Sequence, residues 1–377
     1  MLIENVNRRD LLKLGATGAL SLAVPRAAGA QSAGPIVKPL PPEWFVNFGT
    51  NAEMRWDAAR DLDYLVPAER FFVRNHTRTA TIDPATWRLR VSGPAVRRPL
   101  ELSYRQLERL DSHGLASAIE CAGNGRSFFG SQQGTPAAGT QWKLGGIGAA
   151  NWRGVPLREV LERAGVRRGA VDVLATGLDD TYVNGGVDYG HVRRPVPIAK
   201  ALDDALIAFE MNGRALPPDH GFPARLVVPG WVGIASIKWL GALEVSRAPL
   251  RSPWNTTWYE GLSVQPVKSA FELAWDAQLP AGRSTTLHGR SWSGHAPIRH
   301  VQVSTDGGAS YRHARLRGPN LPNVWVRWEL PFTPRPGRHE LLARATDDTG
   351  LTQPDTVPFK DGGYQFWAVV RHPVTAA

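Results

Sequence analysis

The chain has 377 residues, enough for two ordinary domains, and its 42% hydrophobic and 21% charged residues exclude a disordered protein. Its 38 glycines and 30 prolines favour a loop-rich, β-rich body over a helical bundle. The formal net charge is +10, but arginine supplies 37 of the 44 basic residues and is scattered along the chain. Because there is no lysine-rich tail and no basic block interleaved with aromatic residues, nucleic-acid binding is not expected.

The amino terminus has the composition of an export signal. Residues 7–13 contain the pair Arg8-Arg9, and a modestly apolar stretch follows over residues 14–24. Small residues at positions 28–30 then offer a cleavage site. A frayed amphipathic helix with an accidental arginine pair is the alternative, but all parts occur in the order of a signal. We therefore expect residues 1–30 to be a twin-arginine signal peptide that directs the chain to the periplasm, and no membrane span in the mature chain.

The next two segments differ in composition. Residues 31–66 are rich in proline and asparagine and are predicted to be an extended lead-in over the surface. Residues 67–250 are predicted to form an α+β domain, in which Ser103 followed by Gln106 marks the start of a helix. A second helix is predicted over residues 156–164, an amphipathic run that opens on a proline and ends before a glycine. The β-rich runs of this domain are residues 87–91, 116–120 and 224–229.

Cys121 is the only cysteine, which excludes an intramolecular disulfide, a four-cysteine metal site and covalent c-type haem. A lone cysteine is most often a small buried residue. Here, however, residues 119–126 run from an apolar strand into a loop with two glycines, which allow the backbone to approach a ligand closely. Arg126 in this loop would favour the thiolate, the form that binds metals. The pattern indicates a metal cofactor with a single thiolate from the protein.

The carboxyl-terminal third has the pattern of an immunoglobulin-like sandwich. A tryptophan-rich connector over residues 249–262 leads into a region that alternates apolar and polar residues, and we place this domain at residues 251–377. Turn signals such as Asp306-Gly307-Gly308 separate the runs. The predicted strands include residues 285–289, 298–304, 324–330 and 340–345.

A series of motifs runs in a fixed order from residue 71 to residue 356. The first is Phe71-Phe72-Val73-Arg74-Asn75-His76, and the second is Cys121-Ala122-Gly123-Asn124-Gly125-Arg126. The others are Gly177-Leu178-Asp179, Glu210-Met211-Asn212-Gly213, Asp219-His220-Gly221-Phe222-Pro223, Val227-Val228-Pro229-Gly230, Ile237-Lys238-Trp239-Leu240, Trp292-Ser293-Gly294, Ser304-Thr305-Asp306-Gly307-Gly308 and Gln353-Pro354-Asp355-Thr356. Each motif alone is weak evidence, but the ordered set resembles the sulfite oxidase family, which shares its molybdopterin domain with plant-type nitrate reductases.

The resemblance implies one molybdenum–molybdopterin cofactor per chain, with Cys121 as the only protein ligand to the metal. It also implies a mainly-β molybdopterin domain followed by an immunoglobulin-like dimerisation domain. Arginine and lysine can neutralise the pterin phosphate, and histidine and backbone donors can bind the pterin heteroatoms. The positions that match cofactor-binding residues of the family are Phe72, Val73, Arg74, Asn75, His76, Asp179, His220, Arg225, Ser236, Ile237 and Lys238.

The same resemblance implies a substrate pocket. Arg74 and Arg126 match residues of this pocket, with His76 close by, and two arginines can bind a doubly charged oxyanion. Trp142 and Tyr259 also match it, although their flanking residues differ from those of the animal enzymes. Without the motifs, the two arginines would be interpreted as surface ion-pair residues and the two aromatic residues as core.

Two glycines depart from the family pattern. Animal sulfite oxidases have an arginine directly after the Cys-Ala-Gly-Asn motif, where this chain has Gly125. They have another arginine near the carboxyl end that helps to bind the anion, and its equivalent here is Gly362. The pocket is therefore expected to be less positive than in the animal enzymes.

The predicted function is molybdenum-dependent oxidation of sulfite to sulfate by oxygen-atom transfer, which leaves two electrons on the metal. Because the sequence has no haem-binding domain, the expected acceptor is an external c-type cytochrome, and the expected assembly is a homodimer. The main alternative is a sulfane dehydrogenase subunit of a sulfur-oxidising complex, or another oxidoreductase of sulfur compounds or oxyanions on the same fold. A methionine-sulfoxide reductase, a nitrate reductase and a cofactor-free binding protein are less consistent with the domains and motifs.

Overall fold

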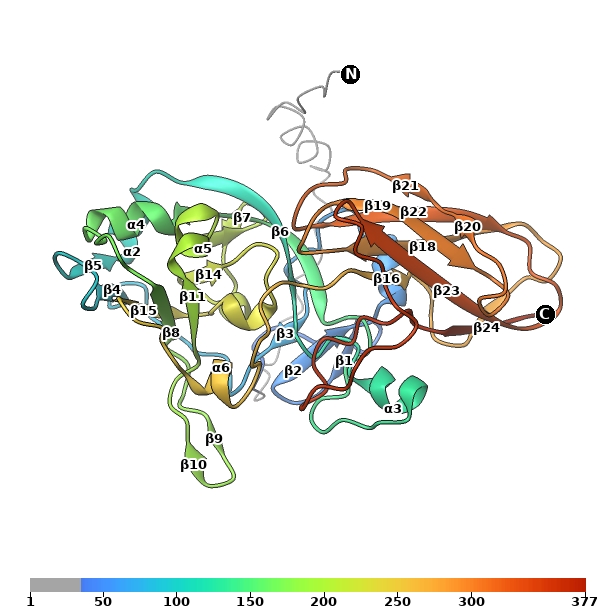
Figure 1. The fold of residues 1–377 in the computed structure, drawn as a ribbon, viewed down its shortest axis with the longest axis horizontal. Coiled ribbons are helices and arrows are strands. Elements are labelled where there is room, and N and C mark those ends of the chain that lie inside the picture. Colours follow the sequence, from blue (N-terminus) through green and yellow to red (C-terminus); the bar gives the residue numbers. More distant parts are fainter. Residues whose placement is uncertain (1–34) are drawn as a thin grey trace, which may run out of the picture. The chain divides into compact units, whose positions relative to one another are not determined.

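Strands dominate the computed structural model of this chain, which describes residues 35–377 (Figure 1). The predicted signal peptide of residues 1–30 lies outside the described residues. Within residues 35–377, no helix is both long enough and apolar enough to cross a lipid bilayer. The expected order, a mainly-β domain followed by an immunoglobulin-like sandwich, is confirmed.

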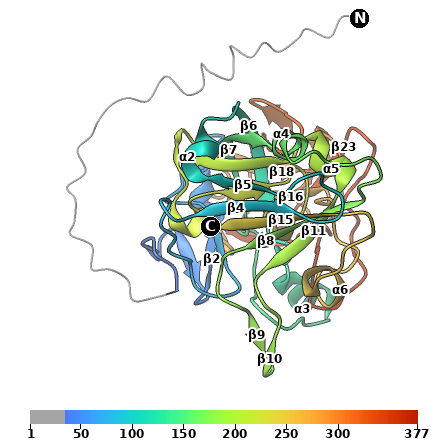
Figure 2. The ribbon, with the colours of Figure 1, turned by 90° about the vertical axis from the view of Figure 1, so that its left-hand side faces the viewer.

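The first domain is built around two five-stranded sheets. In one of them the strand order is β11-β8-β15-β4-β5, and only β15 and β4 are parallel (Figure 2). The strands are β4 (Arg88–Ser92), β5 (Leu100–Ser103), β8 (Asp172–Gly177), β11 (Arg193–Pro197) and β15 (Leu240–Ser246). The helices nearby are α2 (Tyr104–Glu108), α4 (Leu157–Arg163) and α5 (Ile198–Asp203). The predicted capping box is confirmed, since the Ser103 side chain accepts from Gln106 and the Gln106 side chain accepts from Ser103.

The second sheet of this domain carries the cysteine loop. Its order is β13-β12-β7-β6, with β14 paired to β12. The strands are β6 (His113–Glu120), β7 (Ile147–Pro156), β12 (Leu206–Met211), β13 (Arg214–Ala215) and β14 (Arg225–Val227). Because β6 ends at Glu120, Cys121 begins the loop that leads into α3 (Ser127–Gln133).

The segment before the first domain is not the surface lead-in that the composition predicts. It contains β1 (Phe45–Asn47), β2 (Asn51–Met54) and η1 (Asp57–Asp61), and β2 pairs with β3 (Val73–Arg74). All four residues of β2 are buried. The Nη2 atom of Arg290, in the carboxyl-terminal domain, donates to the carbonyl oxygens of Ala59 and Leu62 at 2.9 and 3.1 Å. Residues 35–66 are therefore an integral part of the fold.

Short elements between the sheets carry several residues of the site. They are the hairpin β9 (Val183–Asn184) and β10 (Val187–Asp188), the turns η2 (Pro218–His220) and η3 (Gly233–Ala235), and α6 (Pro253–Thr256). The hairpin, a two-stranded sheet of its own, projects from the body of the first domain in both views (Figures 1 and 2). The helix α6 belongs to the connector that leads into the second domain.

The second domain consists of two sheets with the strand orders β16-β18-β22-β21 and β17-β24-β23-β19-β20. The strands are β16 (Lys268–Phe271), β17 (Ala277–Leu279), β18 (Thr285–Trp292), β19 (Ile298–Ser304), β20 (Arg312–His313), β21 (Arg315–Arg317), β22 (Trp325–Phe332), β23 (Gly337–Asp347) and β24 (His372–Ala376). Val301, Trp328 and Leu341 are buried in the core of this sandwich. The predicted turn at residues 306–308 is present, with φ of 72° at Gly307 and 101° at Gly308.

A single hydrophobic cluster joins the two domains. It contains Met54 and Trp152 from the first part of the chain, Trp292 and Trp325 from the sandwich, and Phe366 from the segment between β23 and β24. Each of these side chains is almost completely removed from solvent, and burial of one large apolar side chain contributes about 1.5–3 kcal/mol. The loop that carries Cys121 lies against this cluster.

Candidate active site

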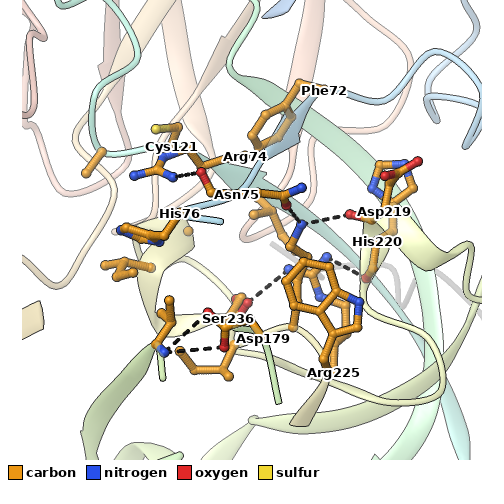
Figure 3. A pocket seen from close by; sticks show the side chains of 18 of the residues that line it. Phe72, Arg74, Asn75, His76, Cys121, Asp179, Asp219, His220, Arg225 and Ser236 are labelled. Carbon is orange, nitrogen blue, oxygen red and sulfur yellow. Dashed lines mark hydrogen bonds between the residues drawn. The ribbon is translucent and has the colours of Figure 1, made fainter. Parts of the chain in front are cut away.

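A pocket opens where β3, the end of β6, the segment after β8 and the turns η2 and η3 meet (Figure 3). It has Cys121 at one end and a group of cationic side chains further along. Its lining residues are Phe71, Phe72, Arg74, Asn75, His76, Ile119, Cys121, Ala122, Asp179, Val192, Asp219, His220, Arg225, Gly233, Ile234, Ser236, Ile237, Lys238, Trp239 and Tyr259.

The backbone holds Cys121 in a tight loop. Its amide donates to the carbonyl oxygen of Gly146 at 2.8 Å, and the amide of Gly123 lies 3.4 Å from its sulfur. A Cβ atom at position 123 would lie 2.8 Å from the Arg126 guanidinium, so only glycine fits there without a shift. At Gly125 the φ angle is +91° and an added Cβ atom would lie 3.1 Å from that of Phe366, so a larger side chain would be strained at this position.

Hydrogen bonds join four polar or aromatic side chains, of which Arg74, His76 and Tyr259 line the pocket together with Cys121. The Nη2 atom of Arg74 donates to the Tyr259 hydroxyl at 3.3 Å. Trp254 Nε1 donates to Nε2 of His76 at 3.0 Å, and the Tyr259 hydroxyl lies 3.5 Å from the same nitrogen. Because Nε2 accepts from Trp254, the proton of the neutral imidazole is on Nδ1. This arrangement provides one fixed cation and two hydrogen-bonding groups next to Cys121.

The charge states in this group follow from burial. Burial opposes the charge of Arg74, but Tyr259 and Cys121 outweigh it and raise its pKa, so the guanidinium remains cationic. For His76, burial and the nearby Arg74 and Lys238 hold the pKa well below its usual range. His76 is therefore neutral at physiological pH and cannot act as a cationic acid there.

Further along the pocket, two buried basic side chains form no ion pair with a described residue. Lys238 Nζ donates to the carbonyl oxygen of Asp219 at 2.8 Å and to Oδ1 of Asn75. Arg225 donates through Nη1 and Nη2 to the carbonyl oxygens of His220 and Ser236, each at 3.0 Å. Burial lowers the pKa of Arg225 to about 9, and burial together with Arg225 lowers that of Lys238 well below its usual range. Both residues bind neutral oxygens in the protein, so an anionic ligand would relieve this charge.

Two carboxylates complete this end of the pocket. Asp179 accepts from the Val192 amide at 3.3 Å through both oxygens, and burial raises its pKa to about 6. Asp219 accepts from the amides of Val37 and Lys38 at 2.9 and 2.8 Å. The first described residues of the chain therefore close the wall behind Asp219.

The residues fit the cofactor that the sequence predicts. The Nε atom of Arg225 is buried and makes no hydrogen bond within the described structure, so a donor remains available for a ligand. Arg225, Lys238 and His220 provide donors for a phosphate, whereas the sulfur of Cys121 provides the soft ligand that molybdenum requires at the other end. The donor set thus suits an elongated anionic group with a metal at one end.

Most of the predicted site residues line the pocket, and three do not. Val73 points to the opposite side of β3, where it packs with Ile36 and Phe45. Trp142 is in the core behind Phe72, with ring centroids 6.2 Å apart. The twelve that line it are Phe72, Arg74, Asn75, His76, Cys121, Asp179, His220, Arg225, Ser236, Ile237, Lys238 and Tyr259.

Arg126 is the third predicted residue that does not line the pocket. Its Nε and Nη1 atoms donate to the carbonyl oxygens of Gly362 and Thr140 at 2.7 and 2.9 Å. Its guanidinium lies 5.2 Å from the ring centroid of Tyr364, which in turn packs on Tyr259 with centroids 4.5 Å apart. Arg126 therefore supports the wall of the site and does not face its interior.

Several residues at the site were missed from the sequence. Tyr364 was not predicted, although it lies only two residues after Gly362. Its ring occupies the space beside that glycine, because a Cβ atom added at Gly362 would lie 2.5 Å from the ring. Trp254 was counted only as part of a tryptophan-rich connector. Arg194, on β11, is 5% exposed and donates to the carbonyl oxygens of Trp254, Tyr259 and Leu262, and no motif marked it.

A second hollow adjoins the pocket at Tyr259, which lines both. It is an open groove of about 610 Å³ between the connector and the loop at residues 359–364. Trp258, Tyr259, Phe359 and Tyr364 supply aromatic surface to it. Tyr259 therefore separates the groove from the pocket that Cys121 lines.

Comparisons with known proteins agree with this geometry. The family model described as oxidoreductase molybdopterin binding domain matches residues 76–254, and the Mo-co oxidoreductase dimerisation domain matches residues 262–361. Sulfite oxidase of Gallus gallus is 37% identical over 325 residues, which cover 78% of this chain and 69% of that protein. Mitochondrial sulfite oxidase of Homo sapiens is 35% identical over 325 residues, covering 78% of this chain and 58% of the human protein.

A solved structure is also similar. The sulfane dehydrogenase SoxCD from Paracoccus pantotrophus matches with a TM-score of 0.76 and 28% identity, over 93% of this chain and 91% of that one. The chain spans 58% of the length of mitochondrial sulfite oxidase from Mus musculus, to which it is 35% identical.

Proposed function

Because the chain belongs to the sulfite oxidase family of molybdopterin-dependent oxidoreductases, we propose that it oxidises sulfite to sulfate, with Cys121 as the protein ligand of the metal. The observation that carries the proposal is the position of the Cys121 sulfur, beside Arg74 and Tyr259 and at the end of a cationic pocket. Arg225, Lys238, His220 and Ser236 would hold the cofactor phosphate, whereas Asn75 and Asp179 would bind the pterin.

The protein residues bind and orient the substrate. When bound, the molybdenum cofactor supplies the oxygen atom that sulfite gains and takes up the two electrons that sulfite loses. Arg74 would bind the sulfite oxygens by charge-assisted hydrogen bonds, and the Tyr259 hydroxyl, which accepts from Arg74, would donate its own proton to the anion. Neutral His76, fixed by Trp254, keeps this group of residues in place without adding a second cation.

The remaining predictions on partners and location are part of the same proposal. Electrons leave singly for an external c-type cytochrome, and two copies of the chain associate through the second domain, as the description of the matching family model suggests. Residues 1–30 direct export to the periplasm by the twin-arginine route. This route suits an enzyme that folds around its cofactor before it leaves the cytoplasm.

Sulfite-dependent reduction of cytochrome c or ferricyanide tests the proposal. The protein should be matured in the periplasm, and its molybdenum content should be measured on the same sample. We expect about one molybdenum per chain and activity that Cys121→Ser abolishes, because the thiolate is the only protein ligand. A molybdenum-loaded protein that does not oxidise sulfite would refute the substrate and leave the cofactor assignment standing.

The groove next to Tyr259 favours a second candidate, a sulfane dehydrogenase subunit that oxidises sulfur carried on a protein. At about 610 Å³ the groove is far larger than sulfite requires, and it shares Tyr259 with the pocket. The arginine missing at Gly362 and the likeness to SoxCD point the same way. Turnover of a peptide persulfide with a much higher kcat/KM than sulfite would establish this candidate over the first.

A further inference from the structure

The loop that carries Cys121 is fastened by side chains of the second domain. Glu120 directly precedes the cysteine and is 1% exposed. Its Oε1 atom lies 2.8 Å from Lys268 Nζ, on β16, and its Oε2 atom accepts from Trp292 Nε1, on β18, at 3.1 Å. The ammonium group of Lys268 also donates to the carbonyl oxygen of Asn124 at 2.8 Å. One buried ion pair therefore holds both sides of the loop.

Asn124 connects this ion pair to the backbone of the cysteine. Its Nδ2 atom donates to Oε1 of Glu120 at 2.9 Å, and its Oδ1 atom accepts from the Gly146 amide at 3.0 Å. Gly146 in turn accepts from the Cys121 amide at 2.8 Å, and the Cys121 carbonyl accepts from the Asn124 amide at 2.9 Å. The network is closed around the cysteine, so a shift of Glu120 would be transmitted to it.

The carboxyl-terminal segment fastens the other side of the loop. The Gln365 amide donates to the carbonyl oxygen of Ala122 at 2.7 Å, and its side chain donates to that of Val264 at 3.0 Å. Phe366 packs against Gly125. The loop is thus held from two directions by residues outside the matched molybdopterin-binding domain.

We propose that Lys268 and Trp292 are positioning residues for the metal ligand, and that through Glu120 and Asn124 they set the direction in which the Cys121 sulfur enters the pocket. The second domain then contributes to the metal centre as well as to assembly. The inference rests on the proposed role of Cys121 as the ligand. Groups that orient a ligand from behind change metal affinity or activity about 10- to 100-fold when they are removed.

The test is Lys268→Met in the holoenzyme. We expect sulfite-dependent kcat to fall about tenfold, with KM changed less than about twofold because Arg74 and Tyr259 are untouched. We also expect the thiolate-to-metal absorption bands and the EPR spectrum of the one-electron-reduced enzyme to shift. The spectra report the geometry of the metal–sulfur bond and do not depend on turnover.

Arg290→Met is the matched control. Arg290 and Glu272 form another buried ion pair of the same domain, but Arg290 binds the carbonyl oxygens of Ala59, Leu62 and Asp63 and does not touch the cysteine loop. This variant should lose stability as Lys268→Met does and keep the wild-type spectra and kcat. If the two variants behave alike in spectra and kinetics, the pair only stabilises the fold and the proposal is wrong.

A second variant covers the case in which Lys268→Met does not retain the metal. Trp292→Phe removes the N–H donor to Glu120 and leaves a smaller ring in the shared cluster, and it should shift the spectra in the same direction by a smaller amount. In cofactor-free protein, iodoacetamide should alkylate Cys121 faster in both variants than in the wild type or in Arg290→Met. Equal alkylation rates and unchanged spectra in Trp292→Phe would overturn the proposal. Absence of sulfite turnover in the wild type would overturn only the substrate, since spectra and alkylation still decide the positioning role.

Discussion

At the scale of single residues, Tyr259 has a strained backbone conformation. Its φ angle is +57°, in the left-handed region that a bulky side chain rarely adopts. The structure holds it there by Arg194, which donates to its carbonyl oxygen at 3.2 Å, and by packing on Tyr364. Such backbone strain persists only where the surroundings determine it, and it is concentrated at functional sites.

Arg194→Met should therefore affect stability and catalysis together. Arg194 donates to three buried carbonyl oxygens, and loss of these bonds should lower the free energy of unfolding by about 3 kcal/mol. Because Tyr259 loses its support, kcat/KM for sulfite should fall about tenfold or more. Arg194→Lys, which keeps a cation and part of the bonding, should lose less in both measurements. Urea unfolding and steady-state kinetics check this, and wild-type kinetics in Arg194→Met would show that the connector does not depend on it.

His220 predicts a pH dependence of stability. Burial, Lys38 and Lys238 hold its pKa well below 6.5 in the folded protein, whereas the unfolded chain takes up a proton near pH 6.5. The contribution of neutral His220 to the free energy of unfolding is thus fully present above pH 6.5. It is lost as the pH falls below that value, by about 1.4 kcal/mol per pH unit. In cofactor-free His220→Asn, the free energy of unfolding should therefore fall less steeply with decreasing pH than in the wild type. The difference should be about 1.4 kcal/mol per pH unit. Urea unfolding between about pH 5 and pH 8 measures it.

His113→Asn is the control for this comparison, because the His113 side chain is exposed. It should follow the wild-type dependence on pH. If the free energy of unfolding of His220→Asn has the same slope against pH as that of the wild type, the burial of His220 does not cause the pH dependence of stability.

At the scale of elements, local signals were sufficient to predict some of the helices and strands. The capping box at Ser103 predicted the start of α2, and the proline before residue 157 predicted that of α4. These signals act within a few residues, so the sequence contains all of the information they need. The alternation of apolar and polar residues predicted β19 over residues 298–304 for the same reason.

Ser103→Ala should therefore change stability alone. Loss of the capping oxygen should lower the free energy of unfolding by about 1 kcal/mol, and sulfite kinetics should be unchanged because no residue of α2 lines the pocket. Thermal or urea unfolding and steady-state kinetics measure the two effects on the same sample. A stability equal to that of the wild type would mean that the fold does not depend on this cap, whereas altered kinetics would contradict the separation of α2 from the site.

Other parts of the molecule could not be predicted because they depend on contacts between distant residues. The polar, proline-rich composition of residues 31–66 suggested a surface segment, yet tertiary contacts bury Asn51–Met54. The resemblance predicted that Arg126 lines the pocket. In the structure its guanidinium donates to the carbonyl oxygen of Gly362, 236 residues away, and lies in the wall instead. No local pattern marks Lys268, since its partner Glu120 is 148 residues away. The motifs thus predict which residues bind the cofactor and do not predict what holds them.

At the scale of the whole molecule, the boundary between the two domains is not a boundary in the core. Trp56, from the segment before the first domain, contacts Trp292 and Trp325 of the sandwich, with ring centroids 5.8 and 6.1 Å apart. Arg290 and Trp325 also bind carbonyl oxygens in residues 59–64. Chains whose domains share a large apolar interface do not unfold their parts independently.

Calorimetry should accordingly show one cooperative unfolding transition for the cofactor-free protein, and not one transition per domain. Trp325→Ala, which removes a completely buried side chain from the shared cluster, should lower stability by about 3–5 kcal/mol. Because the cluster belongs to both domains, the transition should move to lower temperature as a unit and keep its single peak. Val301→Ala, confined to the core of the sandwich, is the matched comparison and should also shift the whole transition. Two separate peaks, of which Val301→Ala moves only one, would show that the domains fold independently and that the cysteine loop gains no stability from the sandwich.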